Sequence, residues 1–265
     1  MNPGKLPISA IVVGKNDGDL LPNCLSRLGF CDELIYVDLG STDGSVALAA
    51  GLGATVIHHE PVPIVEIVHA GLYQQTRHPA ILVTDPDEVL DENLVAQMPR
   101  FLEKITNEKD NYAAIYAPMV NYFQGYRLRG TIWGGDYLGR IILVNRDRFV
   151  FAPYVHNGRL PKDGFNVLNI QFQGNNVVHH FWARSRKQLI EKHRRYIPKE
   201  GESQYNKGLR TNLVKVIQTP FFAFYECFIK HKGYKDSFQG LWLSCFWAWY
   251  KYNSQVQLLR YQRSA

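Results

Sequence analysis

Short apolar runs alternate with helical patterns over the first part of the chain. The runs are rich in β-branched residues and are bounded by polar or glycine-containing segments, which is typical of buried strands. They cover residues 6–13, 33–38, 54–57 and 80–84. Apolar residues at helical spacing follow at 19–28, where Asp19 is the expected N-cap, and at 46–52 and 93–105. This alternation predicts an α/β fold with a mostly parallel sheet and flanking helices on both faces.

The pattern changes after residue 110. Residues 111–178 are irregular and rich in glycine, and short strands are expected at 113–120 and 138–144. Such a segment suits loops that bind a second substrate beside the regular first half. We therefore expect a main domain with two halves, residues 1–110 and 111–195.

A helical tail is predicted for residues 196–265. Basic residues at helical spacing precede it at 184–196, and residues 197–212 have the composition of a linker. Two amphipathic helices are expected over 213–262, interrupted near residues 231–234.

The composition fits one large domain with an appendage and excludes wholesale disorder, since 46% of the 265 residues are hydrophobic. The four cysteines are scattered, which excludes a disulfide scaffold and argues against structural zinc. No apolar stretch reaches the roughly 18 residues that a membrane-spanning helix needs, and no cleavable signal pattern is present. A cytoplasmic protein with reduced thiols is expected.

Charge is distributed unevenly along the chain. Residues 184–265 hold 16 Lys and Arg against 5 Asp and Glu, although the net charge of the whole chain is only +6. Residues 221–252 are also unusually aromatic, with 13 Phe, Trp and Tyr. A basic, aromatic tail predicts an anionic partner, and a membrane surface is favoured over nucleic acid because no nucleic-acid-binding motif is present. Packing of the tail on the main domain, or a homodimer interface, are the alternatives.

Acidic residues follow three of the predicted strands at the point where each ends. Asp17 follows the first strand, Asp38 and Asp43 follow the second, and an Asp-Pro-Asp-Glu segment at 85–88 follows the fourth. Ligands of open parallel sheets bind beyond the carboxyl ends of the strands, so these acids are candidates for a binding site. Asp43 has a structural alternative, because aspartate is favoured as the N-cap of a helix.

The segment at 85–88 is the most specific of these signals. Asp85 and Asp87 are one residue apart at a strand end, so both can reach one hard cation. Mg²⁺ or Mn²⁺ prefers oxygen ligands and commonly keeps substrate phosphates and water in its other positions. Glu88 either supports these acids or is a surface residue.

The order and spacing of these blocks resemble the family 2 glycosyltransferases over roughly residues 6–195. The matching segments are 8–17, 24–25, 32–43 and 85–88. Further segments resemble the branch of lipopolysaccharide-core glucosyltransferases, namely 133–136 with Arg140, 155–156, 179–180, 192–196, 233–236 and 240–241. The resemblance implies the nucleotide-sugar-binding, Rossmann-like fold called GT-A.

The resemblance also implies roles for individual residues. Asp17, Asp38 and the backbone near Val13 would line the base and ribose pocket. Asp85 would contact ribose or metal. Asp87 would be the main metal ligand. His179 or His180 would approach the diphosphate or the metal, with His180 preferred as a metal ligand. Arg140 and Lys192 would hold phosphate oxygens.

Two positions depart from the family pattern. Asp17 stands where the family usually has Glu, which keeps the carboxylate. Asn157 stands where the family has a Glu after His156, and an amide cannot accept a proton from a hydroxyl. Asp136 is the expected replacement as catalytic base, with Asp163 as a weaker candidate.

The resemblance implies an inverting glycosyltransferase. It would move a sugar from a nucleotide diphosphate-sugar to a hydroxyl of a lipid-linked or lipid-anchored glycan, with Mg²⁺ or Mn²⁺ as cofactor. Residues 1–110 would bind the nucleotide sugar and residues 111–195 the acceptor, on the inner face of a membrane. A sugar nucleotidyltransferase and a non-catalytic membrane-associated protein of the same fold are the alternatives.

Overall fold

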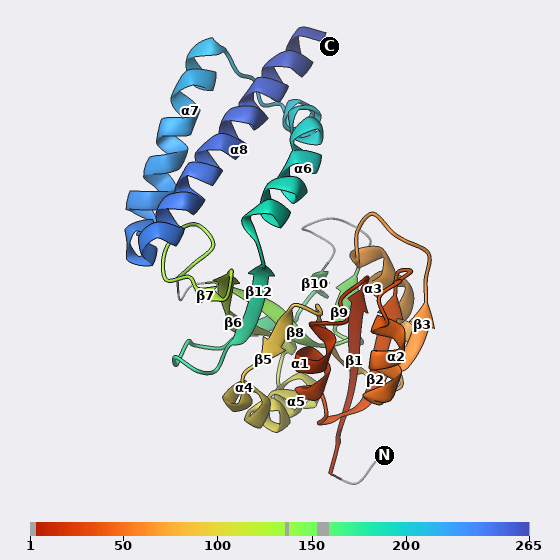
Figure 1. The fold of residues 1–265 in the computed structure, drawn as a ribbon. Coiled ribbons are helices and arrows are strands. Elements are labelled where there is room, and N and C mark those ends of the chain that lie inside the picture. The colour runs from red at the N-terminus through yellow and green to blue at the C-terminus, as the bar shows by residue number, and fades with distance from the viewer. Residues whose placement is uncertain (1–3, 136–137, 153–158, 265) are drawn as a thin grey trace. The chain divides into compact units, whose positions relative to one another are not determined.

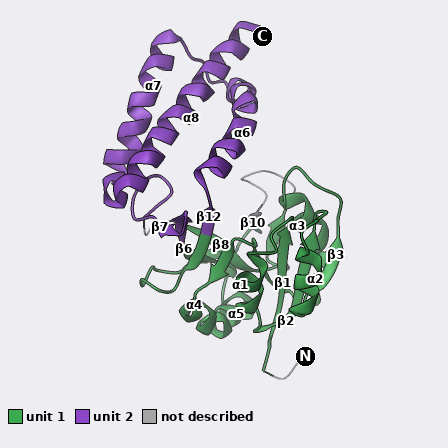
Figure 2. Ribbon diagram, viewed as in Figure 1, with its two compact units in different colours: residues 1–119, 139–180 green, residues 120–138, 181–265 purple. Residues whose placement is uncertain are grey.

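The computed structural model describes residues 4–135, 138–152 and 159–264. The predicted catalytic base Asp136 lies outside the described residues. So do His156 and Asn157, the segment that departs from the family pattern. The chain forms two compact units, shown in green and purple in Figure 2. Unit 1 holds residues 1–119 and 139–180, and unit 2 holds residues 120–138 and 181–265.

Four parallel strands form one part of the sheet of unit 1 (Figure 1). They are β1 (Leu6–Gly14), β2 (Cys31–Asp38), β3 (Thr55–His58) and β4 (Ala80–Thr84), and they lie in the order β3-β2-β1-β4. Each coincides closely with a predicted apolar run. In β4, where all five residues are buried, the run is nearly continuous because a parallel strand covered on both faces favours apolar side chains throughout.

The sheet continues beyond β4 with strands of mixed direction, in the order β8-β6-β12-β5. Antiparallel pairs join β4 to β8, β8 to β6 and β12 to β5. The strands are β5 (Glu88–Leu90), β6 (Tyr112–Phe123), β8 (Gly139–Asn145) and β12 (Val178–Ala183). Smaller strands complete the fold, namely β7 (Tyr126–Arg127) and β11 (Asn166–Asn169) beside β6, and the β9 (Phe149–Phe151) and β10 (Arg159–Pro161) pair.

Alternate side chains of β1 enter two separate hydrophobic cores. Ala10 and Val12 belong to a core with residues of α1 (Leu21–Ser26), α2 (Ser45–Gly51), α4 (Glu92–Ala96) and α5 (Met98–Thr106). Ile11 and Val13 belong to a core with Val68 of α3 (Glu66–Leu72) and with β9. Because neighbouring strand residues point to opposite faces, helices cover the sheet on both sides, as predicted.

Several helix boundaries differ from the prediction. Leu20 rather than Asp19 is the N-cap of α1, and the amides of Leu20 and Leu21 bond to the carbonyl of Asp17 instead. The single helix expected at 93–105 is divided into α4 and α5 at Gln97, because Pro99 begins a new first turn. Helix α3 and the 3₁₀ turn Tyr73–Gln75 were not predicted.

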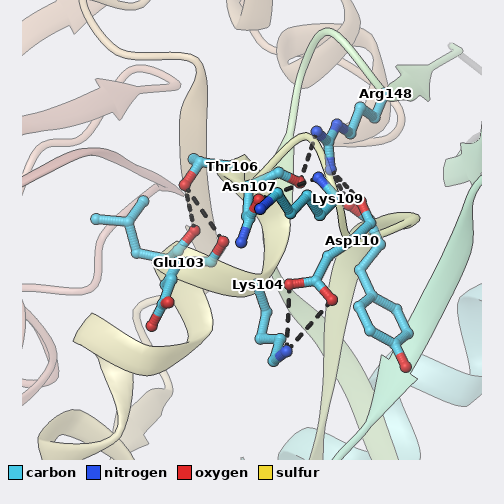
Figure 3. Close-up of polar contacts among 9 residues, drawn as sticks. Glu103, Lys104, Thr106, Asn107, Lys109, Asp110 and Arg148 are labelled. Atoms are coloured by element: carbon cyan, nitrogen blue, oxygen red, sulfur yellow. Dashed lines mark hydrogen bonds and ion pairs between the residues drawn. The ribbon is translucent and has the colours of Figure 1, made fainter.

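Arg148 fixes the connection between α5 and β6 (Figure 3). Its guanidinium donates to the carbonyls of Asn107, Asp110 and Tyr112 at 2.8–3.1 Å. Lys104 forms an ion pair with Asp110 at 3.2 Å in the same turn. Arg148 thereby pairs three backbone carbonyls of this connection, as folded chains generally require of such groups.

Unit 2 is built on three helices. They are α6 (Arg186–Asn206), α7 (Leu213–Tyr225), which continues as a π turn over Glu226–Lys230, and α8 (Ser237–Ser264), preceded by a 3₁₀ turn over Gly233–Asp236. In Figure 1, α8 lies between α6 and α7 and contacts both. The two tail helices and their interruption match the prediction. The linker expected at 197–212 was wrong, because α6 continues through Pro198 to Asn206.

An aromatic core holds unit 2 together. Phe123, Trp133 and Trp182 pack with Trp242 and Phe246 of α8. The start of α8 is close-packed against the preceding turn as well, because a Cβ atom at Gly240 would overlap the carbonyl oxygen of Gly233.

Asp236 ties this turn to the loop after β7. Its carboxylate is fully buried and accepts hydrogen bonds from the amides of Arg129 and Gly130 at 2.7 and 2.8 Å. Burial raises the pKa of Asp236, although these two amides act in the opposite direction.

All four cysteines are free thiols, and Cys24, Cys31 and Cys227 are buried. Within the part of the chain that the structure describes, no helix has both the length and the apolar character required to cross a bilayer.

Candidate functional site

The loops after β1 and β4 meet at Gly14, the last residue of β1. A Cβ atom at Gly14 would lie 2.7 Å from Oδ2 of Asp17 and 2.8 Å from Cγ of Pro86. The register of β1 and β2 places Gly14 opposite Asp38. Acidic residues that are far apart in the sequence therefore gather at one edge of the sheet, as the strand pattern predicts.

Asp38 is a preorganised anion at the end of β2. Its side chain accepts hydrogen bonds from the amides of Ser41 and Gly40 at 2.9 and 3.2 Å, and only 3% of the residue is exposed. His58 Nδ1 lies 3.3 Å from Oδ2, because β3 places His58 opposite Asp38. Burial opposes ionisation, but the bonds from Ser41, His58 and Gly40 prevail and lower the pKa of Asp38.

Asp17 and its neighbours join the loop after β1 to the loop after β2. The amide of Asp17 donates to Ser45 Oγ at 3.0 Å, and Asn16 Oδ1 accepts from the amide of Thr42 at 2.7 Å. Asp43 accepts from the amides of Gly18 and Ser45. Gly44 is the N-cap of α2, so Asp43 serves this helix through Ser45 and not as the cap residue itself. The result is a crosslinked polar rim beside Asp38.

Asp85, which is partly exposed, belongs to a charge cluster with the largely buried Glu88 and Arg140. Nη1 of Arg140 lies 3.1 Å from Oδ2 of Asp85 and forms an ion pair with Glu88. Glu88 is 2% exposed and also accepts hydrogen bonds from Thr84 Oγ1 and the amide of Asp85. Burial disfavours the cation, but the two carboxylates raise the pKa of Arg140 above its usual value. Glu88 thus supports Asp85, and the surface alternative is wrong.

Asp87 and His180 face each other across this edge. Nε2 of His180 lies 3.4 Å from Oδ2 of Asp87, and 19% and 31% of the two side chains are exposed. Strand β12 places His180 opposite Glu88 in the antiparallel pair with β5. Burial lowers the pKa of His180, but the carboxylates of Asp87, Glu88 and Asp85 outweigh it and raise the pKa.

His179 points elsewhere, since neighbouring residues of a strand face opposite sides. Its Nε2 lies 3.2 Å from Oδ2 of Asp91, the N-cap residue of α4. Of the two candidate histidines, His180 is therefore the one beside Asp87.

The donor set of this edge fits a divalent cation that takes ligands from its substrate. No cluster of three or more His, Cys, Asp or Glu side chains arranged to hold a metal occurs within the described ranges. Asp87 and His180 offer one carboxylate oxygen and one imidazole nitrogen, and both side chains are partly exposed. Mg²⁺ sites commonly use one or two protein ligands and complete the shell with phosphate oxygens and water. Asp85 is less available, because Arg140 already binds Oδ2.

The remaining predicted residues lie in different places. The side chain of Val13 is buried in a core, which leaves its backbone as the part that could contribute. Lys192 is exposed on α6, in unit 2. Asp163 follows β10. The neighbouring amide of Lys162 donates a hydrogen bond to the carbonyl of Arg148, which places this segment beside the turn after β8. That turn is next to the start of β4, so Asp163 is remote from Asp85.

Curated relatives are similar to this chain over most of its length. No family model matches the chain. A lipopolysaccharide core biosynthesis glycosyltransferase of Rhizobium meliloti, LpsC, is 26% identical over 266 residues, which cover 98% of this chain and 94% of the relative. An uncharacterized glycosyltransferase of Rickettsia bellii is 22% identical over 240 residues, which cover 88% of this chain and 79% of the relative.

A solved structure shares the fold. The mannosyltransferase PcManGT of Pyrobaculum calidifontis, determined in complex with GDP-Man and Mn²⁺, matches with a TM-score of 0.53 and 10% identity, over 96% of this chain and 87% of that one. The chain has the GT-A fold, and it is similar to curated glycosyltransferases over most of its length. The branch that it resembles is that of the lipopolysaccharide-core glycosyltransferases, in agreement with the sequence motifs.

Proposed function

We propose that the chain is an inverting glycosyltransferase. It transfers a sugar from a nucleotide diphosphate-sugar to a hydroxyl of a lipid-linked or lipid-anchored glycan, with Mg²⁺ or Mn²⁺ as cofactor. The observation that carries the proposal is the approach of Asp87 and His180 to 3.4 Å, at the same sheet edge as Asp38.

Different residues of this sheet edge are assigned to different parts of the nucleotide-sugar donor. Asp38, held as an anion by the amides of Gly40 and Ser41, accepts hydrogen bonds from the nucleoside, and Asp17 lies beside it. Asp87 and His180 would hold the cation, which neutralises charge on the departing diphosphate when it is bound.

Arg140 keeps Asp85 oriented at the rim of the site through the ion pair with Glu88. Lys192 is proposed to contact a phosphate oxygen of the nucleotide sugar. Preorganised charge of this kind is worth more in a partly dry site than in water, and it is expected to supply much of the rate acceleration.

The transfer step is a single displacement. The acceptor oxygen bonds to the anomeric carbon while the bond from that carbon to the phosphate oxygen breaks, so the anomeric configuration inverts. The acceptor proton passes to a carboxylate, for which Asp136 stays the candidate although it lies outside the described residues. The nucleoside diphosphate leaves with the electron pair of the broken bond.

The proposed acceptor follows from the relative and from the tail. LpsC is named for lipopolysaccharide core biosynthesis, and its similarity to this chain includes the tail, since it covers 98% of the chain. Residues 184–265 are strongly basic, which suits a chain that works at the surface of an anionic membrane, with residues 213–262 as the contact.

Product analysis tests this proposal. Wild-type chain is incubated with each common nucleotide sugar, Mn²⁺ and a lipid-linked glycan fraction, and the products are followed by phosphorus and proton NMR. The account predicts release of a nucleoside diphosphate and a new glycosidic bond of inverted configuration. Pyrophosphate release would instead identify a nucleotidyltransferase. Failure to turn over any donor would favour the non-catalytic alternative.

A further inference from the structure

Helix α7 exposes an apolar surface that the described residues of unit 2 leave uncovered. Most of its members recur three or four residues apart and therefore lie on the same half of the helix. We call them the α7 face: Leu213, Val214, Ile217, Phe221, Phe222 and Tyr225. Phe221 and Phe222 are 73% and 67% exposed, and Ile217 is 63% exposed.

The opposite side of α7 accounts for its packing. Val216 and Ala223 are buried, and the π turn that follows buries Cys227. Helix α7 contacts α8 but not α6 to any comparable extent. Contiguous exposed apolar surface commonly marks a site of interaction, so the α7 face is a candidate contact surface.

Exposed lysines accompany this surface. Lys215 lies within α7, and Lys230, Lys232 and Lys235 follow it. The acidic residues of the same stretch point elsewhere. Glu226 accepts a hydrogen bond from Nε1 of Trp247 on α8 at 3.3 Å, and Asp236 is fully buried. Within residues 213–236, the charged side chains that are exposed are therefore all lysines.

Exposed apolar side chains together with lysines favour one kind of partner for the α7 face. A second copy docked face to face would bring two sets of lysines together, which like-charge repulsion disfavours. An anionic bilayer accepts both features, because large aromatic side chains insert at headgroup level and lysines bind anionic headgroups. Helix α7 is too short to cross a bilayer, so it would lie in the plane of the membrane surface.

We propose that the α7 face inserts into the headgroup region of an anionic membrane and holds the enzyme there. This inference rests on the proposed function only in that a lipid-anchored acceptor gives the contact its purpose. The proposed partner of the α7 face is anionic phospholipid.

Vesicle co-sedimentation of the full chain tests the proposal. Vesicles of phosphatidylcholine with phosphatidylglycerol are compared with vesicles of phosphatidylcholine alone. Wild type is expected to bind the anionic vesicles, and Phe221→Ser with Phe222→Ser to lower the partition coefficient about tenfold or more. Because both side chains are mostly exposed, the thermal midpoint should stay within about two degrees of wild type.

A matched control removes exposed apolar residues elsewhere. Leu48→Ser in α2 with Leu52→Ser at its C-cap deletes two side chains that are 41% and 42% exposed, and vesicle binding should not change. Lys230→Gln with Lys232→Gln and Lys235→Gln should remove the preference for anionic vesicles. Equal binding by wild type and the Phe221/Phe222 variant would overturn the proposal. So would a wild-type dimer in analytical ultracentrifugation that only this variant dissociates.

The outcome is separable from that of the proposed function. Nucleotide-sugar binding and product release are measured without vesicles, where the Phe221/Phe222 variant should equal wild type. Vesicle binding without any turnover would overturn the proposed function and leave the α7 face as a membrane contact. Turnover without vesicle binding would overturn the membrane contact and leave the proposed function standing.

Discussion

Nε2 of His180 lies 3.4 Å from Oδ2 of Asp87, whereas its neighbour His179 is turned to Asp91. The two histidines differ by one residue on β12 and therefore face opposite sides of the strand. Of the two histidines, His180 is the one beside Asp87, where the proposed cation would bind. Substitution of each histidine in turn therefore tests the proposed metal site, with His179 as the control.

Replacing each histidine by asparagine should separate the two roles. His180→Asn removes an imidazole ligand, and loss of such a ligand is expected to weaken Mn²⁺-dependent nucleotide binding about tenfold or more. His179→Asn should leave this binding within about twofold, because its contact is to the cap of α4. Isothermal titration calorimetry with and without Mn²⁺ measures both. Equal losses in the two variants would count against a metal role for His180.

Breaking the pair of Arg140 and Glu88 should destabilise unit 1. Arg140→Gln leaves Glu88 buried without its cation, and removing one partner of a buried ion pair costs about 3 kcal/mol or more. Adding Glu88→Gln should restore part of the free energy of unfolding, because the uncompensated charge is then gone. Urea denaturation of both single variants and the double variant measures the coupling. Strictly additive losses would show that the two side chains do not act as a pair.

Gly14 is predicted to be needed for the shape of the site. In Gly14→Ala the new methyl group would press on Asp17 and Pro86, at 2.7 and 2.8 Å, so the two loops must separate. We expect nucleotide affinity to fall about tenfold and stability by about 1–3 kcal/mol, as for other overpacked sites. Gly51→Ala is the control, since nothing lies within 4 Å of the Cβ position there. Unchanged affinity in Gly14→Ala would contradict the contact between the loops.

His193 should make the stability of the chain depend on pH. Its ring packs edge-on against Phe246 and Tyr250, and burial, followed by the charge of Lys192, lowers its pKa despite the carbonyl of Leu189. The unfolded chain then binds a proton near pH 6.5 while the folded chain does not. Stability is therefore fully present above that pH and falls as the pH drops towards the lower folded-state pKa.

Urea denaturation between pH 8 and pH 5 measures this slope. His193→Phe, which cannot bind a proton, should show a smaller loss of stability over this range than wild type. The exposed His59→Gln is the matched control and should retain the wild-type slope. Identical slopes for wild type and His193→Phe would contradict the prediction.

The strands and the meeting edge could be predicted from the sequence because buried parallel strands are continuous β-branched runs. The run at 80–84 is the whole of β4. Helix α6 could not be predicted in the same way, since Pro198 and Gly201 both argue locally against a long helix. The structure gives the reason for Gly201. A Cβ atom there would lie 2.6 Å from the backbone of Gln257, so glycine allows α6 to approach α8 closely.

The site was predictable where one motif carries it and unpredictable where distant elements meet. Asp85 and Asp87 follow a recognisable strand and are separated by one residue. The pairing of Glu88 with Arg140 depends on β8 lying antiparallel beside β4, and nothing local in either segment indicates it. The same holds for His58 beside Asp38, which requires the register of β2 and β3.

Metal-dependent nucleotide binding tests the central claim most directly. A thermal-shift panel of UDP, GDP, ADP, CMP and their sugars, each with and without Mn²⁺, compares wild type with Asp87→Asn. Asp147→Asn is the control, because Asp147 is exposed in the turn after β8, next to the start of β4. A ligand at about 100 times its dissociation constant stabilises the folded chain by about 2.7 kcal/mol. The account predicts a shift with one nucleotide that requires Mn²⁺, persists in Asp147→Asn and is lost in Asp87→Asn. A shift of equal size in Asp87→Asn would contradict it.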